Sequence, residues 1–197
     1  MLIKFWGVRG SIPSGNPETA RVGGNTTCIE IRCGDELIII DTGTGVRKLG
    51  MELMKEMPVK ATILFSHVHW DHIQGFPFFA PFFVPGNEFR IFGGTSLPST
   101  IEEILNQQMT PPCFPVKTDL FGAALSYYDV KPSDVIEGDN YKVTLAPLYH
   151  PNGCYAYRIE HEGQSLVFST DCEHYEDKPN KNLIELSRDA DALIYDA

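Results

Sequence analysis

The sequence lacks the features that mark membrane and secreted proteins. No apolar run among its 197 residues approaches the roughly 20 residues that a membrane-spanning helix needs. The first residues, Met1-Leu2-Ile3-Lys4-Phe5-Trp6, have no basic segment followed by a long apolar one, so they predict a strand and not a signal peptide. We therefore expect no association with a membrane.

The chain also lacks the cysteine pairs of a disulfide scaffold or a thiolate metal site. Its cysteines are odd in number and include no Cys-x-x-Cys pair; they are Cys28, Cys33, Cys113, Cys154 and Cys172. Free thiols in a reducing compartment are the simplest explanation of this pattern. We therefore expect a cytoplasmic protein.

Positive charge is scarce. The chain has 16 Lys and Arg against 26 Asp and Glu, which gives a net charge of −10. General nucleic-acid binding needs clustered Lys and Arg for phosphate contacts, so we do not expect it here. A small anionic substrate stays compatible with this charge, because bound metal ions reverse the sign of a local field.

What is present is a mixture of short β-rich segments, glycine turns and a few helices. Hydrophobic residues make up 43% of the chain and charged residues 21%, as in ordinary soluble domains, and the length suits one domain. Ile, Val, Phe and Tyr predict strands at residues 2–6, 26–32, 36–41, 61–65, 89–92, 141–148, 154–160, 165–169 and 192–196. Apolar periodicity and capping patterns predict helices at about residues 46–57, 100–108 and 183–190, the last two opened by Ser99 with Glu102 and by Asn182 with Glu185. This order of elements predicts an α/β sandwich with mixed sheets.

Ligand-type side chains are densest directly after the strand predicted at 61–65. The segment reads Ser66-His67-Val68-His69-Trp70-Asp71-His72. Imidazole and carboxylate groups suit zinc, manganese or iron. In an extended loop His67 and His69 can turn the same way, while Asp71 and His72 begin a helical turn and can face a second ion. This spacing rarely arises by chance.

Two further candidates follow later strands. His150 comes after the strand predicted at 141–148, and Asp171 comes after the one at 165–169. Alone, the first could be an ordinary loop histidine and the second a helix cap. Because each lies just beyond an apolar strand, a loop can carry both to one edge, and with the first cluster they make a set of six ligands.

These residues together resemble the metallo-β-lactamase superfamily, in the bacterial branch related to cyclic-phosphate and cyclic-nucleotide phosphodiesterases and to ribonuclease Z. The likeness also rests on the segments Phe5-Trp6-Gly7-Val8-Arg9-Gly10-Ser11-Ile12-Pro13, Gly23-Gly24-Asn25-Thr26-Thr27, Asp41-Thr42-Gly43-Thr44-Gly45 and Trp70-Asp71-His72-Ile73-Gln74-Gly75-Phe76. The resemblance implies an αββα sandwich, two mixed β-sheets flanked by helices, and a metal-dependent hydrolase.

The resemblance implies two divalent ions, with zinc first and manganese or iron as alternatives. It places His67, His69 and His150 on one ion and Asp71 and His72 on the other, with Asp171 bridging both. Asp41 matches a position that supports the site without binding metal. The histidine at position 69 points to hydrolysis, since redox di-iron members of this fold carry Glu there.

One element of the family pattern is missing. The family expects a last histidine after a strand like the one at 192–196, and the sequence ends at Ala197. We therefore expect a single domain, residues 1–197, that lacks the carboxy-terminal elements carrying this ligand. Of the unassigned histidines, His161 falls in a predicted hairpin turn, exposed to solvent. His174 is the candidate proton donor or substitute ligand, so that Asp71 and His174 are the residues we assign to catalysis.

The segment from Phe76 onward is rich in phenylalanine and proline. Its aromatic rings either close the core or form a wall beside the active site that stacks a base or contacts a second subunit in a homodimer. The pocket candidates are Phe76, Phe79 and Phe83.

The hypothesis that follows is hydrolysis of a small cyclic or nucleotide phosphodiester by a hydroxide that bridges the two metals. A tRNA 3′-processing endonuclease is the second reading, although the sequence has no basic arm for tRNA. A hydrolase of lactones, thioesters or lactams is the third, and a binding module with one weak metal is the non-enzymatic alternative.

Overall fold

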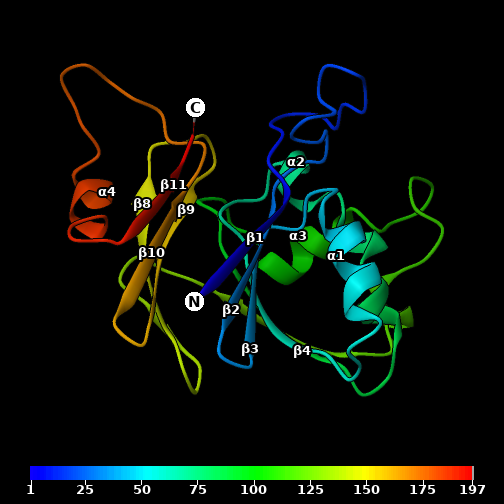
Figure 1. The fold of residues 1–197 in the computed structure, drawn as a ribbon. Coiled ribbons are helices and arrows are strands. Elements are labelled where there is room, and N and C mark those ends of the chain that lie inside the picture. The colour runs from blue at the N-terminus through cyan, green and yellow to red at the C-terminus, as the bar shows by residue number, and fades with distance from the viewer. Residues whose placement is uncertain (197) are drawn as a thin grey trace.

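Two β-sheets lie face to face between helices in the computed structural model, which describes residues 1–196 (Figure 1). The strands of the first sheet are β1 (Leu2–Gly7), β2 (Cys28–Cys33), β3 (Glu36–Ile40), β4 (Lys60–Leu64), β5 (Glu88–Gly93) and β6 (Ala124–Asp129), in that spatial order. The second sheet has the order β11–β10–β9–β8–β7, formed by β7 (Val135–Glu137), β8 (Lys142–Leu148), β9 (Cys154–His161), β10 (Gln164–Ser169) and β11 (Ala192–Tyr195). Both sheets contain parallel and antiparallel pairs, as predicted.

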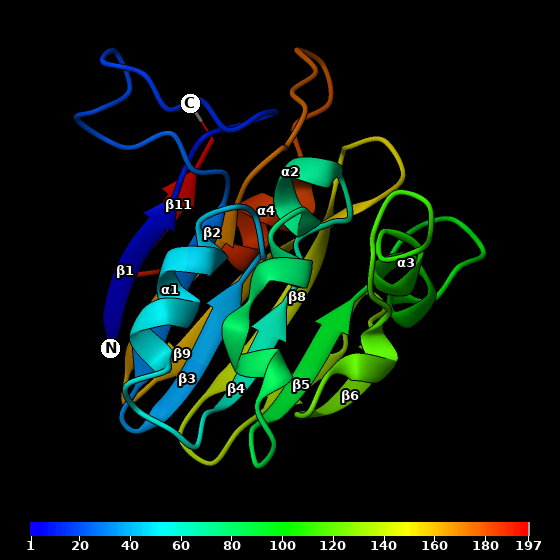
Figure 2. The ribbon, with the colours of Figure 1, turned by 90° about the vertical axis from the view of Figure 1, so that its right-hand side faces the viewer.

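The α-helices are α1 (Val46–Leu53), α2 (Trp70–Ile73), α3 (Ile101–Gln107) and α4 (Lys181–Leu186). All but α2 cover the outer faces, and α2 lies at one end of the sandwich (Figure 1 and Figure 2). Figure 1 shows α1 and α3 outside the first sheet and α4 outside the second, and Figure 2 shows α1 in front of the first sheet. The predicted αββα sandwich is confirmed. None of the helices within residues 1–196 combines the length and apolar character required to cross a bilayer.

Alternation along β3 shows how the sequence builds two cores. Leu37 and Ile39 belong to the core between the first sheet and its helices, whereas Ile38 and Ile40 belong to the core between the two sheets. Successive side chains of a strand point to opposite faces, so a strand covered on both faces is apolar throughout. The strand therefore reads as a continuous apolar run.

The carboxyl ends of the strands that precede the ligand candidates meet at one edge of the sandwich. β3 and β4 pair in parallel. β8 and β10 each pair antiparallel with β9 and so run in the same direction as each other. The loops after these four strands carry Asp41, His67, His150 and Asp171.

Two strands of the structure were not predicted from the sequence. β6 has mostly exposed or half-buried side chains, and β7 has three residues. Both are edge strands. β7 is too short to show an alternation, and in β6 the alternation is limited to the partly buried Leu125 and Tyr127 between exposed residues.

The helix boundaries also differ from the predictions. α1 ends at Leu53, short of residue 57. The capping box of α3 joins Thr100 to Glu103, one residue beyond the predicted pair, and α4 is capped by Asn180 and not by Asn182. For α3 and α4 a nearby residue with an equivalent side chain forms the cap, which sequence alone does not separate.

The aromatic segment mainly closes the core. Phe76, Phe79 and Phe82 are fully buried, and the Phe79 ring lies 5.6 Å from the Phe89 ring of β5. A substrate has no access to Phe76 or Phe79, so the prediction that they line a substrate pocket is wrong: both pack beneath α1 against the first sheet. Phe83 is 40% exposed, and its role in substrate binding stays a prediction.

We expect Phe79→Ala to lower the free energy of unfolding by about 3–5 kcal/mol, because a buried ring is lost and a cavity remains. Urea denaturation measures this change. Phe83→Ala removes the same ring at a partly exposed position and serves as the control, with a clearly smaller loss. Equal losses in the two variants would contradict the assignment of Phe79 to the core.

Candidate metal centre

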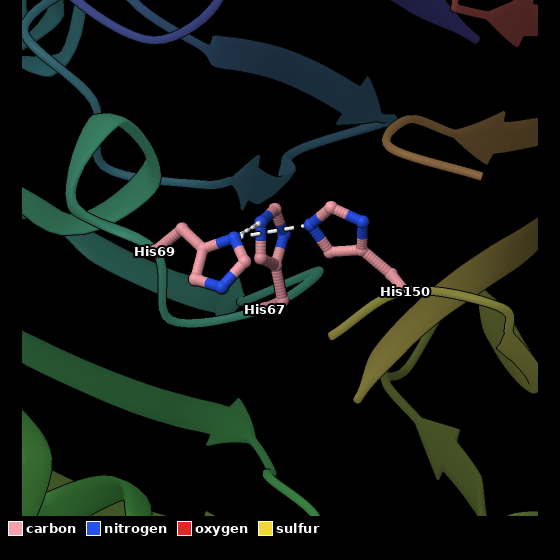
Figure 3. A group of neighbouring side chains, drawn as sticks. All are labelled: His67, His69 and His150. Carbon is pink, nitrogen blue, oxygen red and sulfur yellow. Dashed lines mark hydrogen bonds between the residues drawn. The ribbon is translucent and has the colours of Figure 1, made fainter. Parts of the chain in front are cut away.

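Three histidines turn ring nitrogens toward one point (Figure 3). His67 Nε2 and His150 Nε2 each lie 3.0 Å from His69 Nδ1. His67 and His69 come from the loop after β4, and His150 comes from the loop after β8, so both sheets contribute. Two nitrogens that bind one ion at zinc–imidazole distances lie about 3–3.5 Å apart. The three nitrogens therefore have the spacing of a shared ion.

A second group adjoins the first and shares His67 with it. It consists of His67, His72 and Asp171, whose ligand atoms lie within 4.8 Å of one another. His72 Nε2 is 3.2 Å from Asp171 Oδ2 and 3.5 Å from Asp71 Oδ2. The structure thus gathers all six predicted ligands at one edge of the sandwich; that they bind metal stays a prediction.

The amino-terminal loop contributes a contact to this second group. The backbone N–H of Ser11 donates to Asp71 Oδ2 at 2.7 Å, across 60 residues of sequence. Ser11 adopts a left-handed conformation, with a φ of 66°. Burial favours the neutral acid, but the hydrogen bonds from His72 and Ser11 outweigh it and hold the pKa of Asp71 well below its ordinary value. Asp71 is therefore a carboxylate at neutral pH.

The pKa values of the clustered histidines shift in opposite directions. Burial, together with repulsion from His72, lowers the pKa of His67 to about 3, and burial also lowers the pKa of His69. Both rings are neutral, which is the form that binds metal. Burial disfavours charge on His72 as well, but Asp41, Asp171 and Asp71 outweigh it and raise its pKa to about 12.

These charge states suit the binding of divalent cations. Neutral imidazoles offer lone pairs to an ion, and the carboxylates beside His72 stabilise positive charge at that point. In the metal-free protein a proton on His72 supplies this charge. Because a ligating imidazole has to be deprotonated, His72 would give up a proton in order to hold an ion.

Asp41 lies behind His72, fully buried at the end of β3. Its Oδ2 accepts from His72 Nδ1 at 2.8 Å and its Oδ1 accepts from the backbone N–H of Ser66 at 2.8 Å. A carboxylate on one ring nitrogen fixes the tautomer and leaves the other nitrogen for a metal. Asp41 is thus placed to orient a ligand and not to bind the ion.

The remaining histidines lie outside both groups. His174 is exposed, and its Nε2 is paired with the hydroxyl of Tyr195. His161 is buried, contrary to the predicted exposed turn, because its Nδ1–H donates to the Asn140 carbonyl at 2.7 Å. That contact joins two loops distant in sequence, and no local pattern signals it.

Comparison with known proteins identifies the family. The family model described as the β-lactamase superfamily domain matches residues 37–197. The ribonuclease Z of Methanothermobacter thermautotrophicus is 30% identical over 164 residues, which cover 81% of this chain and 48% of that protein. The chain spans about half the length of the curated relatives it matches.

Solved structures show the same fold. The metallo-β-lactamase fold protein YhfI from Bacillus subtilis superposes with a TM-score of 0.68 at 22% identity, covering 97% of this chain and 68% of that one. A diphosphatase from the PhnP family superposes with a TM-score of 0.65 at 19% identity, covering 97% and 72%.

We expect zinc to raise the melting temperature of metal-free protein, because an ion that binds only the folded state stabilises it. At a free concentration about 100 times the dissociation constant the gain is about 2.7 kcal/mol. Scanning calorimetry after dialysis against chelator measures the shift. His150→Ala removes a ligand candidate and should shrink it, whereas His161→Gln removes a histidine outside both groups and should not. An equal shift in all three proteins would place the bound metal elsewhere.

Proposed function

The chain belongs to the β-lactamase superfamily and has the metallo-β-lactamase fold, and on this premise we propose that it is a metal-dependent phosphodiesterase. The observation that carries the proposal is the pair of adjoining ligand groups that share His67. Paired metal sites of this kind are a recurrent solution for displacement at phosphorus.

Two ions are proposed, with zinc as the first choice and manganese or iron as alternatives. His67, His69 and His150 would hold one, and Asp71 and His72 the other, with Asp171 between them. Such ions supply Lewis acidity to phosphoryl oxygens and lower the pKa of an attacking water. The donor set lacks thiolate, which suits this hydrolytic use.

The protein's own residues prepare the site. The Ser11 N–H holds the Asp71 carboxylate in place, and the Asp41 carboxylate holds a proton on His72 Nδ1. Burial keeps His67 and His69 neutral. The ligand atoms are thereby oriented before any substrate binds, so no free energy is lost in reorganising them during the reaction.

The substrate that we propose is a small cyclic or nucleotide phosphodiester. The similarity to proteins named ribonuclease Z and to a diphosphatase supports chemistry at phosphorus. The net charge of −10 opposes long nucleic acids, whose binding depends on neutralising many phosphates. A small diester presents few charges to this acidic chain.

A tRNA 3′-processing endonuclease is the second candidate, and the 30% identity with a ribonuclease Z favours it. Cleavage of a precursor tRNA, set beside a cyclic nucleotide, separates the two. Hydrolysis of a lactone or thioester in the same assays would favour a carbonyl substrate instead.

We expect the protein to hydrolyse bis(p-nitrophenyl) phosphate after reconstitution with zinc or manganese and not after metal removal. Release of nitrophenolate measures the rate. His69→Ala should abolish turnover, because the three-histidine group loses its central nitrogen. Turnover that survives both the chelator and this substitution would contradict a metal-dependent mechanism.

His174 is proposed as the proton donor to the leaving group. If it serves this role, His174→Ala should lower kcat about 10²–10⁴-fold for a poor leaving group and much less for nitrophenolate, which needs no proton. Tyr195→Phe removes the hydroxyl partner of His174 and keeps the imidazole, so it is the matched control. Equal effects of His174→Ala on both classes of leaving group would argue against proton donation.

A further inference from the structure

The hydroxyl of Ser66 lies between the two ligand groups and the buried carboxylate behind them. Ser66 is fully buried in the loop after β4, directly before His67. Its Oγ is 2.8 Å from Asp41 Oδ2, 3.1 Å from His67 Nδ1 and 3.4 Å from His72 Nδ1. Because the hydroxyl is buried, it cannot contact solvent or substrate, and its hydrogen bonds inside the protein are what it contributes.

The position of the single hydroxyl proton follows from these contacts. A carboxylate only accepts hydrogen bonds, so the contact of 2.8 Å to Asp41 Oδ2 requires the Ser66 proton. The Ser66 oxygen then offers only lone pairs to His67. The contact of 3.1 Å therefore places a proton on His67 Nδ1.

A second neighbour of His67 leads to the same assignment. Cys154 Sγ is 3.9 Å from His67 Nδ1 and 3.5 Å from the Thr170 carbonyl, to which its thiol proton is directed. Its sulfur thus faces His67 as a weak acceptor. The Ser66 oxygen and the Cys154 sulfur can therefore only accept a hydrogen bond from His67 Nδ1, and a proton on Nδ1 provides it.

We propose that Ser66 is a positioning residue that relays the hydrogen bond of Asp41 to His67. With its proton on Nδ1, His67 presents a bare Nε2 toward His69 and His150, where the ligand atoms converge. Asp41 acts on His72 directly and on His67 through Ser66. One buried carboxylate thereby holds a proton on the Nδ1 of two ligand candidates, directly on His72 and through Ser66 on His67.

The inference rests on the metal site of the proposed function, but none of its readouts requires turnover. A protein that binds metal and fails to cleave any phosphodiester still tests it. If no metal binds, the proposed function fails, while the tautomer of His67 can still be measured.

The first experiment reads this tautomer in the metal-free wild-type protein. Two-bond ¹H–¹⁵N correlation spectra of the imidazoles near neutral pH distinguish a proton on Nδ1 from one on Nε2. The His67 signals are assigned by their loss in His67→Gln. We expect the proton on Nδ1, and a proton on Nε2 would overturn the proposal whatever the variants show.

The second experiment compares zinc dissociation constants, measured by competition with a chromophoric chelator. Ser66→Ala removes the hydroxyl and keeps the backbone N–H that Asp41 also accepts. We expect its dissociation constant to rise about 10–100-fold, the usual effect of losing a partner behind a metal ligand. Ser66→Thr keeps a hydroxyl and should restore most of the affinity.

Ser169→Ala is the matched control. Ser169 is likewise fully buried, at the end of β10, but within residues 1–196 its hydroxyl has no hydrogen-bond partner. We expect wild-type affinity in this variant. If Ser66→Ala binds zinc as tightly as Ser169→Ala, the relay is refuted; if Ser66→Ala does not fold, the wild-type spectrum decides.

Discussion

The buried carboxylate of Asp41 is the interaction on which the rest of the site depends. A charge removed from water destabilises the fold by several kcal/mol unless hydrogen bonds replace its hydration. Asp41 accepts from the backbone N–H and the hydroxyl of Ser66 and from His72 Nδ1. The ends of β3 and β4 and the start of α2 are therefore held at one point. A shift of any of these three segments leaves a buried charge without a partner.

The two sheets must also keep their relative positions, because the ligand candidates come from both. His150 and Asp171 follow strands of the second sheet, and His67 follows a strand of the first. Two hydrogen bonds join the sheets at this edge: Tyr157 Oη donates to the Phe65 carbonyl at 2.7 Å, and the Tyr155 N–H donates to the Ser66 carbonyl at 2.8 Å. Together with the apolar core between the sheets, they fix the separation that the converging nitrogens require.

Three of the chain's acidic residues act together at this edge of the sandwich. Asp41, Asp71 and Asp171 surround His72, and their combined field keeps that ring charged in the metal-free protein. The same field attracts a divalent ion, while the neutral rings of His67 and His69 offer it lone pairs. Bound metal ions would concentrate positive charge locally on a chain of net charge −10, which makes an acidic protein compatible with the anionic substrate that we propose.

The sequence by itself determined an α/β sandwich with mixed sheets, most of its strands and the cluster of six ligand candidates, and its resemblance to a known superfamily implied the αββα arrangement. It did so because buried strands read as apolar runs and because loops after such strands meet at one edge. Only the tertiary structure decided which neighbours serve these ligands. Ser11 reaches Asp71 across 60 residues, and His161 is buried against Asn140. Phe76 and Phe79 belong to the core and not to a pocket. Each of these outcomes depends on contacts between segments far apart in the chain. A local pattern of residue types does not show which distant segment will pack against it.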